Sequence, residues 1–381
     1  MLKFVHAADL HLDRPFRSLP QEQAAARRQG QRQLLDRLMT LCEEEQADFL
    51  LLAGDLFDGQ RVYPETVEAL CAALGSTAMP VFLSPGNHDY LHAASPYLTA
   101  KFPKNVHIFT TETLSTSELE AAVIYGHAYT AATSQARPLA GFTVPQDGRF
   151  HIGLVHGDLG AAQTHYALVQ REEIAASGLD YLALGHIHQR SEPAQAGRTV
   201  YAYSGCPEGR GFDECGELGC YVVSLERSKP ADLRFVPLAQ YRYFDRTVQG
   251  GEDADWESLA AQCFDGMTKR DALRISFTGE VAENRPDLTA LRAKFAPLVD
   301  SLTLRDATVP AQNLWVRMEE DSLTGLFLRE LRRRWDDPLA NNTGGLSPEA
   351  VEAMVTVHRE SLTLALRYGM AALEGREEPS L

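Results

Sequence analysis

The sequence lacks the features of a secreted, membrane-spanning or disulfide-stabilised protein. Its N-terminus reads as a strand, without the basic region, apolar run and small-residue cleavage site of a signal peptide, so none is expected. No uninterrupted apolar stretch approaches the roughly 20 residues that a transmembrane helix needs, so no membrane partner is expected. The six cysteines are scattered without a CxxC pair, which favours reduced thiols in the cytoplasm over a zinc or redox site.

Positive charge is scarce relative to negative charge. The 36 Lys and Arg residues are outnumbered by 52 Asp and Glu residues, which gives a formal net charge of −16. This balance argues against nucleic acid as a partner, but bulk charge mainly governs solubility and long-range steering. A local basic groove or bound divalent cations can still hold a phosphate backbone. The composition therefore makes DNA binding less expected without excluding it.

The chain up to residue 228 alternates short apolar runs with helical segments. This alternation predicts a layered α/β core. The helices are expected at 23–45 and 64–74. The run at 49–53 is apolar throughout, as in a strand that is covered on both faces. The expected strands lie at 3–7, 49–53, 80–83, 122–125, 151–156, 181–184, 200–203 and 219–225.

The remaining sequence has a different pattern, and a chain of 381 residues is long enough for two or three domains. Residues 232–310 read as strand, helix, strand, helix, strand, which predicts a small α+β domain. Residues 311–381 are predicted to be helical, with a helix at 322–335 and a final helix that begins near Pro348. A linker that contains Pro, Asn and Gly separates the two helices. The predicted domains are therefore 1–228, 232–310 and 311–381.

Five short segments of the first domain place metal-ligand side chains directly after an apolar run. They are Asp9-Leu10-His11, Gly54-Asp55, Gly86-Asn87-His88-Asp89, His156-Gly157 and Gly185-His186-Ile187-His188. In open α/β sheets, functional sites are assembled at the carboxyl ends of the strands. A single GD or HG pair carries little information. All five segments in this order, each behind an expected strand, favour a metal site over chance.

The types of side chain in these segments indicate the metal and the chemistry. A mixture of His, Asp and Asn suits divalent ions such as manganese, iron or zinc and does not form a thiolate site. The ligands are too many for one tetrahedral ion. Two ions about 3.5–4 Å apart, bridged by a carboxylate, would use them all, and that arrangement serves in-line attack on phosphorus.

The five segments resemble the signature of the calcineurin-like metallophosphoesterase superfamily, over nearly all of residues 1–225. Within it, 4–13 and 54–58 look like the bacterial SbcD and YhaO repair nucleases, and 203–212 looks YhaO-like. The resemblance implies a layered β-sandwich core flanked by helices and a capping domain at 232–310. It also implies C-terminal helices at 311–381 that dock an SMC-like ATPase of the SbcC type. The implied activity is a manganese-dependent DNA exonuclease, with endonuclease activity as well, in the cytoplasm and at the nucleoid.

The resemblance also implies a role for each residue at a matching position. One metal would be held by Asp9, His11, Asp55 and His188, and the other by Asp55, Asn87, His156 and His186, with Asp55 as the bridge. His88 would stand beside the scissile phosphate, as proton donor to the leaving oxygen or as stabiliser of developing charge. Asp89 would orient His88.

Two departures from the family pattern leave the metal ligands intact. Asp58 stands where archaeal and eukaryotic relatives usually carry histidine, and Asp13 replaces a common glycine. Both leave the balance of exonuclease and endonuclease activity open.

Other functions compete with the nuclease. A phosphoprotein phosphatase would have a different second motif, a small-nucleotide phosphodiesterase would not need the long C-terminal region, and a non-catalytic scaffold for the ATPase would lack ligands. A homodimer also stays open.

Overall fold

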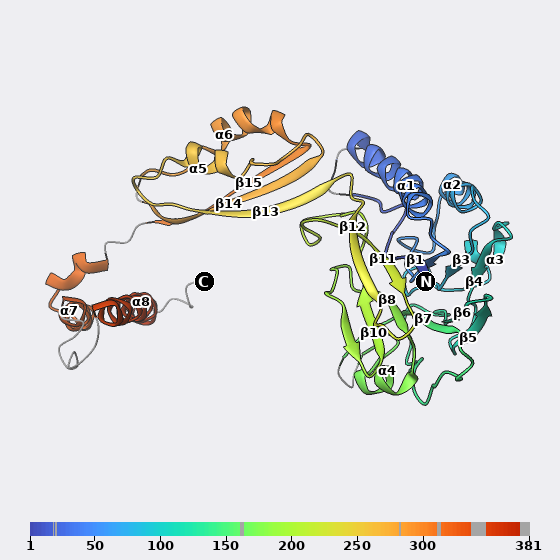
Figure 1. Cartoon of the computed structure of the whole chain (residues 1–381). Coiled ribbons are helices and arrows are strands. Elements are labelled where there is room, and N and C mark those ends of the chain that lie inside the picture. The colour runs from blue at the N-terminus through green and yellow to red at the C-terminus, as the bar shows by residue number, and fades with distance from the viewer. Residues whose placement is uncertain are drawn as a thin grey trace. The chain divides into compact units, whose positions relative to one another are not determined.

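The computed structural model describes residues 1–17, 19, 21–160, 164–281, 283–310, 314–336 and 348–373. Its larger part contains two six-stranded sheets (Figure 1). The first sheet has the order β12 (Asp232–Pro237), β11 (Gly219–Leu225), β1 (Leu2–Ala7), β2 (Phe49–Leu52), β3 (Val81–Leu83), β4 (Val106–Ile108). The second has the order β5 (Ser115–Glu118), β6 (Ala122–Gly126), β7 (Phe150–His156), β8 (Tyr181–Gly185), β10 (Thr199–Tyr203), β9 (Ala194–Ala196).

The alternating side chains of the strands build separate layers of the core. In β2, Phe49 and Leu51 belong to the apolar layer that also contains residues of the second sheet, such as Ile152 of β7. Leu50 and Leu52 point the other way and pack with helix residues. Successive residues of a strand face opposite sides of its sheet, so an entirely apolar run is needed where both sides are covered. The predicted β-sandwich is confirmed.

Helices cover the outer faces of the sandwich. Residues of α1 (Gln21–Glu44) and α2 (Pro64–Leu74) pack with the outer layer of the first sheet (Figure 1). In α4 (Arg171–Ser177), Ile174 packs with the outer layer of the second sheet. The short helix α3 is Pro96–Thr99. The predicted helices at 23–45 and 64–74 and the predicted long strands are confirmed. The short elements β4, β5, β9 and α4 carry too few residues to give a periodic signal.

Most neighbouring strands run parallel within each sheet. In the first sheet β1, β2, β3 and β4 are parallel, and in the second sheet β6, β7, β8 and β10 are parallel. The carboxyl ends of each parallel set therefore lie at one edge of its sheet. Loops that leave this edge are the natural place for a site, since their backbone is not committed to the sheet.

The segment after the sandwich forms a third, three-stranded sheet. Its order is β13 (Arg242–Gln249), β14 (Asp271–Val281), β15 (Ser301–Pro310). Helix α5 (Trp256–Gln262) follows β13, and α6 (Leu288–Phe295) with the short turn η1 (Ala296–Leu298) follows β14. This order of elements agrees with the one expected from the sequence. Strand β12 belongs to the first sheet, and the three domain boundaries stay a prediction.

The last described elements are the turn η2 (Leu314–Glu319) and the helices α7 (Leu323–Asp336) and α8 (Pro348–Leu373). The two helices share a small apolar core, made of Leu328, Leu331, Leu362, Leu366 and Met370. Part of the apolar pattern of α8 is thus covered by the chain itself. The predicted linker at 337–347 lies outside the described residues.

By its internal contacts the chain divides into two units. One comprises residues 1–248, 256–277 and 286–306, and the other comprises 249–255, 278–285 and 307–381. Among the described helices, none combines the length and apolarity that crossing a membrane requires.

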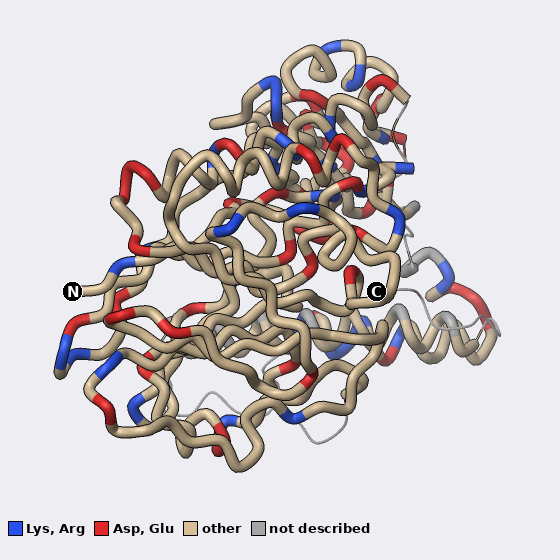
Figure 2. The backbone as a smooth tube through the Cα atoms, turned by 90° about the vertical axis from the view of Figure 1, so that its right-hand side faces the viewer, with Lys and Arg blue, Asp and Glu red and all other residues tan. Residues whose placement is uncertain are grey.

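Basic and acidic positions are interspersed along the backbone in the view of Figure 2. On α7, Arg332 pairs with Asp336 at 2.9 Å and Arg334 with Glu330 at 3.0 Å, both within the helix.

Candidate metal centre

The predicted ligands all lie at the ends of parallel strands. Asp9 and His11 follow β1, Asp55 follows β2 and Asn87 follows β3. His156 is the last residue of β7, and His186 and His188 follow β8. The first four therefore come from one sheet and the other three from the second. The site is assembled where the two sheets present the carboxyl ends of their strands.

The backbone at several of these residues has an uncommon conformation. The φ angles of Asp9, His11 and Asp55 are 55°, 44° and 51°, and that of His186 is 105°. Side chains disfavour positive φ, and each such residue costs on the order of 1–3 kcal/mol. Backbone hydrogen bonds between the two loops hold the conformation, from Asp9 N to Gly54 O and from His11 N to Asp55 O, both at 3.0 Å. Such strain tends to gather at functional sites.

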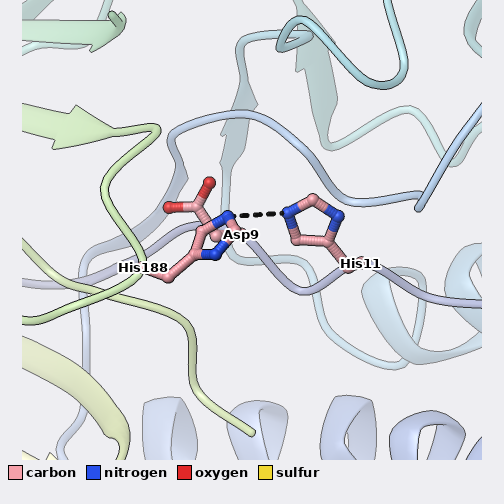
Figure 3. Close-up of side chains that lie close together, drawn as sticks. All are labelled: Asp9, His11 and His188. Atoms are coloured by element: carbon pink, nitrogen blue, oxygen red, sulfur yellow. Dashed lines mark hydrogen bonds between the residues drawn. The ribbon is translucent and has the colours of Figure 1, made fainter. Parts of the chain in front are cut away.

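Asp9, His11 and His188 form one group of donors. Their ligand atoms lie within 4.8 Å of one another. The Nε2 atoms of His11 and His188 face each other at 3.2 Å, with the Asp9 carboxylate beside them (Figure 3). Asp9 and His11 are fully buried. Two imidazole nitrogens and a carboxylate turned towards one point, away from water, suit a divalent metal ion.

A second group lies around Asn87. Its Oδ1 atom is 3.0 Å from Nε2 of His156 and 3.1 Å from Nδ1 of His186. The carboxylate of Asp55 lies between the two groups, since its Oδ2 atom is 3.4 Å from Nε2 of His156 and 3.7 Å from Nε2 of His11. The structure thus brings the predicted ligands together, with Asp55 in the middle. Asp9 is also close to Asp55 and His156, with ligand atoms within 4.8 Å.

Each of the four imidazoles has its second ring nitrogen beside an oxygen outside these groups. The pairs are His11 Nδ1 with Asp58 Oδ1 at 3.2 Å, His156 Nδ1 with Ala53 O at 2.8 Å, His186 Nε2 with Asp158 Oδ1 at 3.2 Å, and His188 Nδ1 with Glu214 Oε1 at 2.9 Å. Metal-binding histidines usually donate their other N–H in this way, which fixes the tautomer and the orientation of the ring. In the neutral form of such a ring, the remaining nitrogen is unprotonated and able to bind a metal.

Electrostatics in the site follow from the burial of so many charges. Burial lowers the pKa of His11 and of His186 to about 4, which keeps both in the neutral form that binds metals. Burial also raises the pKa of Asp9 to about 6. Burial alone would raise the pKa of Asp55, but the neighbouring His156 holds it below its ordinary value. Burial opposes protonation of His156, yet Asp55 raises the pKa of that imidazole to about 9. Divalent cations would compensate these buried carboxylates.

His88 and Asp89 occupy the same loop but lie in different surroundings. His88 is exposed, its ring lies 4.8 Å from that of His11, and its Nδ1 atom is 3.3 Å from the carbonyl oxygen of Asp58. Asp89 is buried, and its carboxylate accepts hydrogen bonds from Gly86 N at 2.8 Å and Leu56 N at 2.7 Å. Among the described contacts, Asp89 therefore acts on the two loop backbones, and it holds the His88 loop without touching the His88 ring.

Two of the outer partners, Asp158 and Glu214, were not among the predicted site residues. Asp158 stands two residues after His156, so its nearness was a usable signal. Glu214 belongs to the loop between β10 and β11 and gave no metal-like pattern. His127, the other histidine after a strand, accepts from His156 N at 3.3 Å or donates to its carbonyl at 3.1 Å and is buried behind the site.

Residues 2–190 match the family described as calcineurin-like phosphoesterase. Over this segment the chain is similar to the calcineurin-like metallophosphoesterases, in agreement with its sandwich fold and its groups of Asp and His donors. The matching family is one of phosphoesterases, and the site offers groups of Asp and His side chains that could hold a metal ion.

Three relatives give the finer comparison. The uncharacterized metallophosphoesterase YhaO of Bacillus subtilis is 32% identical over 237 residues, 59% of this chain and 57% of the relative. The SbcD component of the nuclease SbcCD from the same organism is 27% identical over 61% of this chain and 67% of its own length. The DNA double-strand break repair protein Mre11 of Methanopyrus kandleri is 24% identical over 67% of this chain and 61% of its own. The alignment with YhaO thus spans little more than half of that protein.

A glycine next to the central carboxylate offers a test of the site. A Cβ atom at Gly86 would lie 2.2 Å from Oδ1 and 2.6 Å from the backbone N of Asp55, whereas one at Gly59 would meet nothing within 4 Å. Gly86→Ala is expected to displace Asp55 and to weaken metal binding by at least about tenfold, as the loss of supporting contacts at metal sites does. Gly59→Ala is the control and should bind metal like the wild type. Metal content is measured by elemental analysis, and circular dichroism checks that each variant is folded. Unchanged metal binding in folded Gly86→Ala would contradict the assignment of Asp55.

Proposed function

We propose that this chain is a two-metal DNA nuclease that hydrolyses phosphodiester bonds, with manganese as its metal. The observation that carries the proposal is the arrangement of the four imidazoles, each with one nitrogen beside an outer oxygen and the other turned towards the shared carboxylates and Asn87. DNA as substrate is supported by two relatives whose names are those of a nuclease component and of a double-strand break repair protein.

The ligands divide into two sets in this proposal. One ion would be held by Asp9, His11, Asp55 and His188, and the other by Asp55, Asn87, His156 and His186. The nearness of Asp55 Oδ2 to nitrogen atoms of both sets supports its role as the bridge. The donors are His, Asp and Asn without a thiolate, which suits manganese and related ions.

When bound, the ions would supply an activated water and would neutralise charge on the phosphate. The chain itself positions the general acid and the residues that hold the acid in place. His88 would give a proton to the leaving oxygen. The Asp58 carbonyl can only accept, so the His88 Nδ1 atom beside it donates, and Nε2 is the atom available for proton transfer. Asp89 fixes the loop that carries His88 through the backbone of Gly86.

His88 can be separated from the ligands by experiment. His88→Ala is expected to keep both metals, because this exposed side chain is not needed to hold them, and to lower kcat by about 10²–10⁴-fold, the usual contribution of a general acid. His11→Ala, at a buried ligand position, is the contrast and should lose metal. Elemental analysis beside a hydrolysis assay separates the two roles. If His88→Ala lost a metal, His88 would have to be reassigned as a ligand.

The substrate is tested with labelled single- and double-stranded DNA in the presence of manganese. Cleavage of DNA is expected to exceed hydrolysis of the monoester p-nitrophenyl phosphate, and Asp55→Asn should abolish both because it removes the bridging carboxylate. Strong monoesterase activity without DNA cleavage would favour a phosphatase instead. DNA cleavage that survives Asp55→Asn would point to a contaminating nuclease.

The α7–α8 pair is the proposed docking region for an SMC-like ATPase of the SbcC type. One relative is itself part of an assembly, the nuclease SbcCD. The two helices bury one another through Leu328 and Leu366, yet leave other large apolar side chains exposed. These are Leu323, Leu326, Met354, Val357 and Leu364. Exposed apolar groups gathered on a small unit commonly mark an interaction surface.

The docking region is tested in the full chain with a double variant, Leu326→Asp with Val357→Asp. Both side chains are more than half exposed, at 61% and 62%, so the change should leave folding and hydrolysis intact while binding of the ATPase is lost. Co-purification with the ATPase gives the measurement. The control is Leu98→Asp, which changes a leucine of the sandwich that is 55% exposed. Undiminished ATPase binding in the double variant would move the docking site elsewhere.

A further inference from the structure

Arg210 is a buried cation beside a proposed metal ligand. It lies in the loop between β10 and β11, and its side chain is only 6% exposed. Its Nη2 atom is 2.7 Å from Nδ1 and 3.4 Å from Nε2 of His188. A guanidinium in this position is repelled by divalent cations at the same ligand. A buried positive charge next to proposed metal ligands is unfavourable unless a negative group compensates it.

Glu214 compensates the charge and fixes the orientation of the guanidinium. The Nε atom of Arg210 is 3.1 Å and 3.0 Å from the two carboxylate oxygens of Glu214, and Nη2 is bonded to the same group. The backbone N of Arg210 also donates to Glu214 at 2.9 Å. Such a fork of parallel bonds permits little movement. The side chain is therefore preorganised before any substrate arrives.

The third guanidinium nitrogen, Nη1, has a different position. Its described contact is with Asp58 Oδ1 at 3.6 Å, which is an ion pair but too long for a hydrogen bond. None of the described hydrogen bonds of Arg210 uses this atom. Nη1 thus retains N–H donors for a further acceptor.

Asp58 connects this nitrogen to the reacting part of the site. Its Oδ1 atom is 3.2 Å from Nδ1 of His11, and its carbonyl oxygen is 3.3 Å from Nδ1 of the exposed His88. Arg210, His11 and His88 therefore surround a single residue. An anion bound next to His88 and His11 would therefore lie near Asp58, the residue that Nη1 also contacts.

The loop that carries Arg210 is held in place by the small sheet. The ring of Phe212 packs edge-to-face on Tyr243 of β13, with centroids 5.3 Å apart, and the guanidinium of Arg274 from β14 lies 4.6 Å from the Phe212 centroid. The backbone adds a hydrogen bond from Gly216 N to Tyr243 O at 3.0 Å. Donors held this firmly act well on charge that develops in a reaction, since they need no reorganisation.

We propose that Arg210 is a phosphate-binding residue of this site, whose Nη1 atom donates to a non-bridging oxygen of the phosphodiester. The proposal rests on the proposed function, since it assumes a phosphate ester at these metal ligands. A fork-shaped donor suits phosphate oxygens, and a positive charge there favours the crowded negative charge of the transition state. The competing role is structural, with Arg210 serving only to neutralise Glu214 and so to support His188.

The experiment uses Arg210→Gln in the full, manganese-loaded protein, with inorganic phosphate as the probe. Phosphate affinity is measured by calorimetry and as inhibition of bis(p-nitrophenyl) phosphate hydrolysis, and metal content by elemental analysis. We expect unchanged metal content, at least about tenfold weaker phosphate binding, and a loss in kcat/KM of about 10²-fold, the effect of removing one preorganised donor. The control is Arg149→Gln, which removes an arginine paired with Asp147 at 2.7 Å at the opposite end of β7 and should change none of these values.

Two results would overturn the proposal. One is wild-type phosphate affinity in Arg210→Gln, and the other is a loss of phosphate binding that only parallels a loss of metal, which would make Arg210 a support of His188. If Arg210→Gln fails to fold, Arg210→Lys keeps a charge for Glu214 but offers no second nitrogen, so it should also bind phosphate more weakly. Wild-type affinity in that variant would refute the role of Nη1. The phosphate-binding measurement uses inorganic phosphate and does not depend on DNA. If the protein failed to cleave DNA, only the nuclease proposal would therefore be refuted.

Discussion

The site is centred on the buried carboxylate of Asp55. It is 1% exposed, and one of its oxygens lies within 4 Å of imidazole nitrogens from both halves of the site. Its other oxygen accepts a hydrogen bond from His88 N at 2.9 Å. A charge so far from water is stable only with close compensation. The imidazoles provide this compensation. The positive φ angles of the loop residues and the absence of a side chain at Gly86 allow the close approach.

The rigidity of the surrounding loops has an identifiable source. Asp89 accepts hydrogen bonds from backbone N–H groups of two loops and from the hydroxyl of Tyr97, so it ties the end of β2 to the end of β3. On the other side, Gln31 of α1 donates to the carbonyl oxygen of His11 at 3.0 Å. Outer hydrogen bonds of this kind decide how well a metal site keeps its geometry. The fold therefore supports the ligands from both the sheet and the covering helix.

The negative net charge and a phosphate substrate are compatible once the charge is considered locally. Acidic and basic positions are interspersed over the backbone (Figure 2), and many of the basic residues are committed to ion pairs, such as Arg332 with Asp336. In the proposed function, the attraction for phosphate would come from bound metal ions and from a few well-placed cations such as Arg210. Short-range interactions of this kind are less affected by salt than a broad basic surface would be.

The sequence by itself predicted the long strands and helices and the types of the candidate ligands. Apolar runs such as 49–52 specify strands buried on both faces, and the position of Asp9, Asp55 and His156 behind such runs already indicates a metal site, because both signals are local in the chain. Only the tertiary structure decided that Glu214 stands behind His188, that Asp89 binds backbone and not the His88 ring, and that α8 covers α7. These contacts join residues far apart in sequence, or depend on the direction in which a loop turns. No periodicity encodes them, since they arise only when the two sheets and their loops are brought together.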